Sequence, residues 1–109
     1  MVPTQYTNKG CFTGFYDVNN NPIHEGDVIH FRNFRAVVIF NEFHNVWTNV
    51  FIGAYNDMQR NPYCRSMYLA DYDAGLSDST ISYWGIRVSG NIYKNPAQLS
   101  DNSLLAYQN

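Results

Sequence analysis

The chain has 109 residues, of which 45% are hydrophobic and 15% charged, and its formal net charge is −2. This composition excludes intrinsic disorder as the default state, because disordered chains combine low hydrophobicity with high net charge. The small negative charge excludes a general attraction to phosphate backbones or anionic membranes. We therefore expect one globular domain over residues 1–109.

The first half of the chain alternates short runs of β-forming residues with turn residues. Asparagine, glycine and proline separate the runs, as expected for tight turns between strands. An aromatic content of 17% also favours strands. The predicted strands cover residues 11–17, 23–24, 28–31, 34–40 and 46–52.

The second half of the chain is less regular. Residues 53–79 are predicted to form a long loop with one short strand at about residues 66–69, and a loop of this length is either functional or hides an element. Strand residues return at 80–88 and at 92–93. Asn95, Pro96 and Gln98 supply an N-cap, a proline at the first helical position and the end of a capping box, which predicts a short helical turn.

Several short strands separated by turn residues are typical of small all-β domains. The chain is therefore predicted to be mainly β, as a small SH3-like barrel or a rolled antiparallel sheet with one short C-terminal helical turn. No signal peptide or membrane-spanning run is visible, so we expect a cytoplasmic protein without a membrane partner. Cys11 and Cys64 could form one bridge, but two thiols in a reducing cytoplasm are the preferred interpretation.

Two segments near opposite ends of the chain form recognisable motifs. Residues 12–29 read FTGFYDVNNNPIHEGDVI, and residues 88–99 read VSGNIYKNPAQL. The first resembles the TGL-x-D-x-x-G-x-x-I-x-EGD-x-V signature of the YopX-like family of phage and prophage proteins, and the second is similar to its closing I-GN-I-x-x-NP-x-L pattern. Phe15 and Asn21 stand where that family usually has leucine and glycine.

The resemblance implies a β-rich protein of the bacterial host cytoplasm that forms homo-oligomers, and it implies no particular chemistry. Its motif residues are interpreted as architecture. Glycines permit backbone conformations closed to other residues, aspartates cap turn amides, and Ile23, Val28 and Ile92 fill the core. The structural motif comprises Gly14, Asp17, Glu25, Gly26, Asp27, Gly90, Asn91, Asn95 and Pro96.

Histidines and carboxylates near Gly26 suggest a metal site only at first sight. Along an extended strand His24 and His30 would lie about 20 Å apart, so only a sharp turn could let them share an ion with Glu25 or Asp27. No cofactor is expected.

Sequence motifs for catalysis are absent, and we expect a non-enzymatic protein. Cys64 lies between Arg60 and Arg65, yet an inert thiol is the preferred interpretation. A hydrolase acting on nucleic acid through Asp71 and Asp73 ranks last among the possible functions.

Arginines next to aromatic residues are the strongest functional signal. Such pairs suit a protein interface, and they also suit phosphate contact combined with base stacking. A third reading is that the rings are core and the arginines solvated. The candidate binding surface comprises Arg32, Arg35, Trp47, Tyr55, Arg60, Tyr63, Arg65 and Tyr68.

Two functions follow from these observations. The first is a phage or prophage accessory protein acting as an oligomeric binding module, whose partner is itself, a host protein or a phage protein. The alternative is a counter-defence protein that captures a nucleotide signal, through Arg60, Arg65 and tyrosines, or that inhibits a host nuclease.

Overall fold

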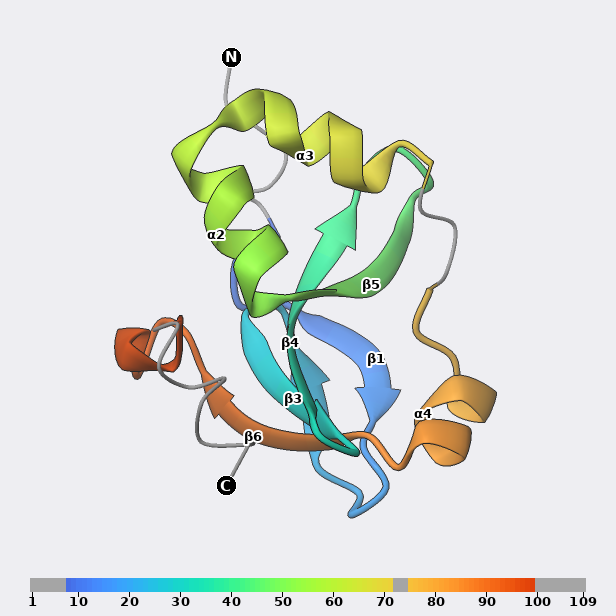
Figure 1. Ribbon diagram of the computed structural model, residues 1–109. Coiled ribbons are helices and arrows are strands. Elements are labelled where there is room, and N and C mark those ends of the chain that lie inside the picture. Colours follow the sequence, from blue (N-terminus) through green and yellow to red (C-terminus); the bar gives the residue numbers. More distant parts are fainter. Residues whose placement is uncertain (1–7, 72–74, 100–109) are drawn as a thin grey trace.

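The computed structural model describes residues 8–71 and 75–99, and it is mainly β (Figure 1). Strands β1 (Phe12–Tyr16) and β2 (Pro22–His24) form a small antiparallel sheet. A larger antiparallel sheet has the order β5-β4-β3-β6. Its strands are β3 (Asp27–Phe31), β4 (Phe34–Asn41), β5 (Val46–Phe51) and β6 (Arg87–Asn91). The predicted mainly β class is therefore confirmed, but these strands do not close into a barrel.

Both faces of the larger sheet are buried, and β4 shows why. Val37 and Ile39 point to one face, where they pack with Ile52 and Met58 of the helical layer. Ala36 and Val38 point to the other face and join a second cluster. Because successive strand side chains alternate between faces, the continuous apolar run of β4 is the expected pattern for a strand covered on both sides.

Three α-helices occupy regions where the sequence predicted loop or strand. They are α2 (Ile52–Arg60), α3 (Pro62–Leu69) and α4 (Asp78–Trp84). In Figure 1, α2 and α3 cover one side of the sheet and α4 lies near β6. No helix among the described residues is long and apolar enough to cross a membrane.

The long-loop prediction for residues 53–79 was wrong because it missed helical spacing and capping. Ile52, Tyr55 and Met58 recur every three residues and are the buried side chains of α2. Asn61 caps α3 by accepting a hydrogen bond from the backbone of Tyr63. Pro62 is the first residue of that helix, where a proline is favoured.

The strand predicted at residues 80–88 was also wrong for its first part. Ser77 and Thr80 form a reciprocal capping box that starts α4, and Gly85 ends it with a φ of +67°. Only Arg87 and Val88 of the predicted strand belong to β6. Residues 92–93 form a turn instead of a strand.

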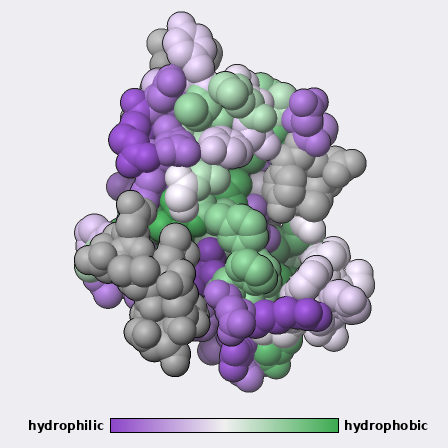
Figure 2. All heavy atoms as spheres, viewed as in Figure 1, coloured by the Kyte–Doolittle hydropathy of each residue, from purple (hydrophilic) through white to green (hydrophobic). Residues whose placement is uncertain are grey.

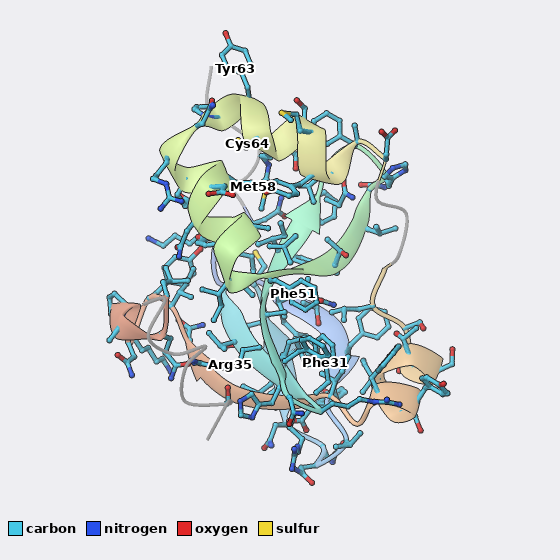
Figure 3. All side chains as sticks on the ribbon, in the orientation of Figure 1. Phe31, Arg35, Phe51, Met58, Tyr63 and Cys64 are labelled. Atoms are coloured by element: carbon cyan, nitrogen blue, oxygen red, sulfur yellow. The ribbon has the colours of Figure 1, made fainter. Side chains whose placement is uncertain are left out.

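The predicted C-terminal helical turn is present as a 3-10 helix, η1 (Pro96–Leu99). Its expected side-chain capping by Gln98 is replaced by another contact, since the Gln98 Oε1 accepts a hydrogen bond from Arg35. This contact places η1 against the sheet next to β6 (Figure 3).

Candidate binding surfaces

An aromatic groove lies where the β3–β4 turn, the end of β5 and the end of α4 meet. We define it by the side chains of Phe31, Phe34, Phe51 and Trp84, which line an apolar pocket of about 500 Å³. Ring centroids are 5.8 Å apart for Phe31–Phe34, 5.4 Å for Phe34–Phe51 and 6.0 Å for Phe31–Trp84. These separations are those of interacting aromatic pairs.

Three of the four aromatic residues of the groove are about half exposed to solvent, and Phe31 is partly buried. Phe34 is 49% exposed, Phe51 53% and Trp84 40%. Figure 2 shows a hydrophobic patch at the centre of this face, flanked by hydrophilic residues, and Figure 3 shows Phe31 and Phe51 close together between α2 and α4. A contiguous exposed apolar patch of this kind marks a binding surface more often than scattered exposed residues do.

Arg32 lies at the edge of the aromatic groove. Its guanidinium carbon is 4.8 Å from the centroid of the Trp84 ring, a cation–π contact. Its φ is +56°, a left-handed conformation that is uncommon for residues other than glycine and asparagine. The strained turn directs a positive charge to the border of an otherwise apolar pocket.

A second pocket, here called the tyrosine pocket, has a volume of about 380 Å³ and a mixed polar lining. Glu25 and Tyr55 each retain only 8% exposure, and Tyr93 completes the polar wall. The Glu25 Oε1 accepts hydrogen bonds from the Tyr93 hydroxyl at 2.7 Å and from the Gly10 backbone at 2.9 Å. The Lys9 ammonium lies 4.7 Å from the centroid of the Tyr93 ring.

The electrostatics of the tyrosine pocket follow from the buried carboxylate. Burial raises the pKa of the Tyr55 hydroxyl, and the charge of Glu25 raises it further. Burial also raises the pKa of Tyr93, and the hydrogen bond to Glu25 adds to that effect. Both tyrosines are therefore held in their neutral form beside a negative charge.

The eight residues of the predicted binding surface do not form one surface. Arg32 and Tyr68 lie at the aromatic groove, whereas Tyr55 and Arg65 line the tyrosine pocket. Arg35 is buried and donates to Gln98. The others lie elsewhere, with Trp47 half-buried against Phe40, Arg60 exposed on α2 and Tyr63 pointing away from the body of the molecule.

Arg60 and Arg65 are both engaged with carboxylates. Arg65 donates to Glu42 at 2.6 and 2.7 Å and to the carbonyl of Phe40 at 2.8 Å. Arg60 pairs with Asp57 at 2.5 Å. The two guanidinium groups are therefore committed to partners within the chain.

The motif residues occupy turns and contacts. Gly14 and Gly26 have φ values of +89° and +88°. Asp17 accepts from the backbone of Asn19 and Asn21, and Asp27 accepts from that of His24. The side chain of Asn91 donates a hydrogen bond to the carboxylate of Asp27, and Gly90 lies against the side chain of Gln98. Asn95 and Pro96 lead into η1.

Other candidate chemistry is not assembled in the described parts of the chain. Residues 8–71 and 75–99 contain no group of three or more histidine, cysteine, aspartate or glutamate side chains placed to hold a metal ion. Cys11 and Cys64 are not joined by a disulfide. Asp71 is exposed, and Asp73 lies outside the described residues.

Sequence reasoning missed Trp84, Phe51 and Tyr93 as surface-forming residues. Trp84 was assigned to a strand, so its position beside Arg32 could not be foreseen. Tyr93 follows the Gly90–Asn91 motif directly, and its contact with Glu25 joins segments that are 68 residues apart. In the sequence, the contact between Tyr93 and Glu25 was indicated only by the resemblance of the two motifs to one family signature.

The fold and these surfaces define a small, mainly β protein with an aromatic groove and a tyrosine pocket, and residues of α2 line both pockets. A family model described as YopX protein matches residues 4–100. The chain therefore belongs to the YopX family. No curated protein and no solved structure matches the chain.

Proposed function

We propose that this protein is a non-enzymatic phage or prophage accessory protein of the bacterial cytoplasm, and that it acts as an oligomeric binding module through its aromatic groove. The observation that carries the proposal is the gathering of four aromatic side chains, three of them 40–53% exposed, around one apolar pocket. Aromatic residues dominate the energetics of protein interfaces because they bury a large area at a small cost in side-chain entropy.

The first partner we propose is a second copy of the chain. Most homo-oligomers pair the same surface patch across a two-fold axis, so one self-complementary groove suffices. The net charge of −2 opposes such pairing only weakly. A host or phage protein carrying an apolar segment would use the same groove.

Native mass spectrometry and light scattering over a range of concentrations test this function. The wild-type protein is expected to be oligomeric, and Phe34→Ser and Phe51→Ser are each expected to weaken association by about tenfold or more. Tyr63→Ser is the matched control, because Tyr63 is 80% exposed but lies outside the groove. A wild-type protein that stays monomeric, or a Tyr63→Ser variant as impaired as the groove variants, would count against this proposal.

The alternative, counter-defence by capture of a nucleotide, is favoured by one observation. Arg32 stacks on Trp84 beside the exposed ring of Phe34, an arrangement that could hold a base and a phosphate. Arg60 and Arg65 contribute less to this alternative than their sequence suggested, because both are paired. Calorimetry with cyclic and linear nucleotides tests it, and the absence of heat in the wild type and in Arg32→Ala alike would remove it.

A further inference from the structure

The tyrosine pocket has the composition of a site for a cation. Its lining includes Glu25, which is 8% exposed, and the rings of Phe40, Tyr55 and Tyr93. A buried carboxylate surrounded by aromatic rings attracts ammonium groups by charge and by cation–π contact. The lining contains two positive side chains, Lys9 and Arg65. Arg65 is neutralised by its two hydrogen bonds to Glu42.

The chain itself already places an ammonium group at this pocket. Lys9 is exposed, yet its Nζ lies 4.7 Å from the centroid of the Tyr93 ring. The turn that carries Lys9 is fixed by the Gly10 backbone, which donates to Glu25 Oε1 at 2.9 Å. Lys9 and Glu25 line the same pocket, so the Lys9 ammonium occupies the face of the Tyr93 ring that a cation from outside the chain would contact.

We propose that the tyrosine pocket binds a primary alkylammonium group from outside the chain, and that Lys9 is its intramolecular competitor. Glu25 supplies the counter-charge, whereas the rings of Tyr93 and Tyr55 supply the faces against which the ammonium and its alkyl chain pack. The neutral hydroxyl of Tyr55 adds an acceptor for one N–H bond. This site is separate from the aromatic groove, so its existence does not depend on self-association.

Two sources could present this chemistry, a lysine side chain of another protein and a free diamine. Nα-acetyl-lysine methylamide represents the first source and 1,5-diaminopentane the second. Titration of the full chain with each probe, followed by backbone amide NMR shifts at Gly10 and Gly26, reports binding at the pocket. Saturation by the lysine probe points to a protein lysine, and saturation by the diamine alone points to a free amine.

Three variants decide the proposal. Lys9→Met is expected to tighten binding by roughly three- to tenfold, because the competing cation–π contact is lost. Glu25→Gln is expected to weaken binding by about tenfold or more, since the counter-charge is removed. Lys94→Met is the control, as Lys94 is an exposed lysine next to Tyr93 that does not line the pocket, and it is expected to change nothing.

Thermal unfolding of each variant separates loss of the site from loss of the fold. If Glu25→Gln does not fold, Lys9→Met carries the test alone, since Lys9 is exposed. The proposal is overturned if neither probe saturates the wild type or Lys9→Met. It is equally overturned if Lys9→Met and Lys94→Met bind alike, or if folded Glu25→Gln binds as tightly as the wild type.

Discussion

The hydroxyl of Tyr93 donates a 2.7 Å hydrogen bond to Glu25 Oε1 across 68 residues of sequence. A backbone hydrogen bond of 2.9 Å from Ile92 to the carbonyl of Gly26 runs beside it. These two contacts join the two segments that resemble the family signature. The signature therefore records a long-range contact between the β2–β3 turn and the turn after β6, which neither segment forms alone.

The first prediction concerns the hydroxyl of Tyr93. Tyr93→Phe is expected to lower the free energy of unfolding by about 1–2 kcal/mol, because a hydrogen bond to a buried carboxylate is lost. Denaturant unfolding near neutral pH measures the change. Tyr83→Phe is the control, since Tyr83 is 73% exposed, and a loss as large in this variant would assign the effect to something other than Glu25.

The same contact predicts a dependence on alkaline pH. The pKa of Tyr93 is raised above its ordinary value of 10.0 by burial and by the hydrogen bond to Glu25. The contribution of this hydrogen bond to the free energy of unfolding is therefore complete below about pH 10, where the Tyr93 hydroxyl is protonated in both the folded and the unfolded chain. It is lost as the pH rises from there toward the pKa of the folded state. The stability difference between wild type and Tyr93→Phe should stay constant up to about pH 10 and shrink between about pH 10 and about pH 12. A difference that stays constant over this range would contradict the assignment.

Gly26 and Gly14 provide a second, matched prediction. Both have φ near +89° or +88°, but a Cβ on Gly26 would collide with the Tyr93 ring, whereas a Cβ on Gly14 would meet no atom within 4 Å. Gly14→Ala should cost about 1–2 kcal/mol of unfolding free energy from backbone strain alone. Gly26→Ala should cost clearly more, because strain and collision add.

Chemical denaturation of the two glycine variants, together with Gly26→Ala/Tyr93→Ala, checks this reasoning. The double variant removes the ring, so it is compared with Tyr93→Ala, which already lacks the hydrogen bond to Glu25. In that background Gly26→Ala should cost only the backbone strain, as Gly14→Ala does. If Gly26→Ala and Gly14→Ala cost the same, the ring of Tyr93 moves away freely and is not held by Glu25.

The third prediction concerns Asp17, whose carboxylate ties two parts of the chain together. It accepts from the backbone of Asn19, Asn21 and Val88 at 2.8–2.9 Å. Burial alone would raise the pKa of Asp17, but these hydrogen bonds hold it below its ordinary value of 3.8. The stabilisation is thus present above about pH 4 and is lost as the pH falls through the lowered folded pKa.

Asp17→Asn is expected to cost about 1–3 kcal/mol near neutral pH, since the amide replaces only part of the carboxylate's acceptors. The cost should fall when unfolding is measured at about pH 3, because the carboxyl of the unfolded wild-type chain takes up a proton there. Asp71→Asn serves as the exposed control. If the loss of unfolding free energy in Asp17→Asn does not depend on pH, the side-chain geometry at this position matters and its charge does not.

The strands and the motif turns could be predicted from the sequence because their signals are local. The runs that form β3, β4 and β5 are bounded by turn residues, and their predicted limits agree with the structure to within one residue. Asparagine and glycine mark positive φ at Asn20, Gly26 and Asn45. Each of these features depends on neighbours within a few residues.

The helices and the candidate sites could not be predicted in the same way. The aromatic and β-branched residues of α4 favour strands, and the capping box at Ser77 overrides that preference. Asn61 and Pro62 carry the same N-cap and proline signals that indicated η1, yet they lie in the segment that was predicted to be a long loop. The aromatic groove depends on tertiary contacts between β3, β5 and α4, which no local pattern encodes.

The last prediction separates Arg65 from Arg60, which the sequence treated as equivalent ligands for phosphate. Arg65 is largely buried and donates to both oxygens of Glu42 and to the carbonyl of Phe40. Arg65→Ala should therefore lower the free energy of unfolding by about 2–3 kcal/mol, because it leaves a partly buried carboxylate unpaired. Arg60→Ala should change it by less than about 0.5 kcal/mol, because its pair with Asp57 is exposed.

A double-mutant cycle with Glu42→Gln tests whether the loss at Arg65 arises from this pair. Burial raises the pKa of Glu42, but the hydrogen bond and the charge of Arg65, together with a backbone hydrogen bond, lower it by more. Neutralising both partners should therefore cost less than the sum of the single changes. Additive losses would mean that Arg65 acts through the carbonyl of Phe40 alone. A stable Arg65→Ala protein that loses a co-purified nucleotide would instead restore the phosphate-binding role.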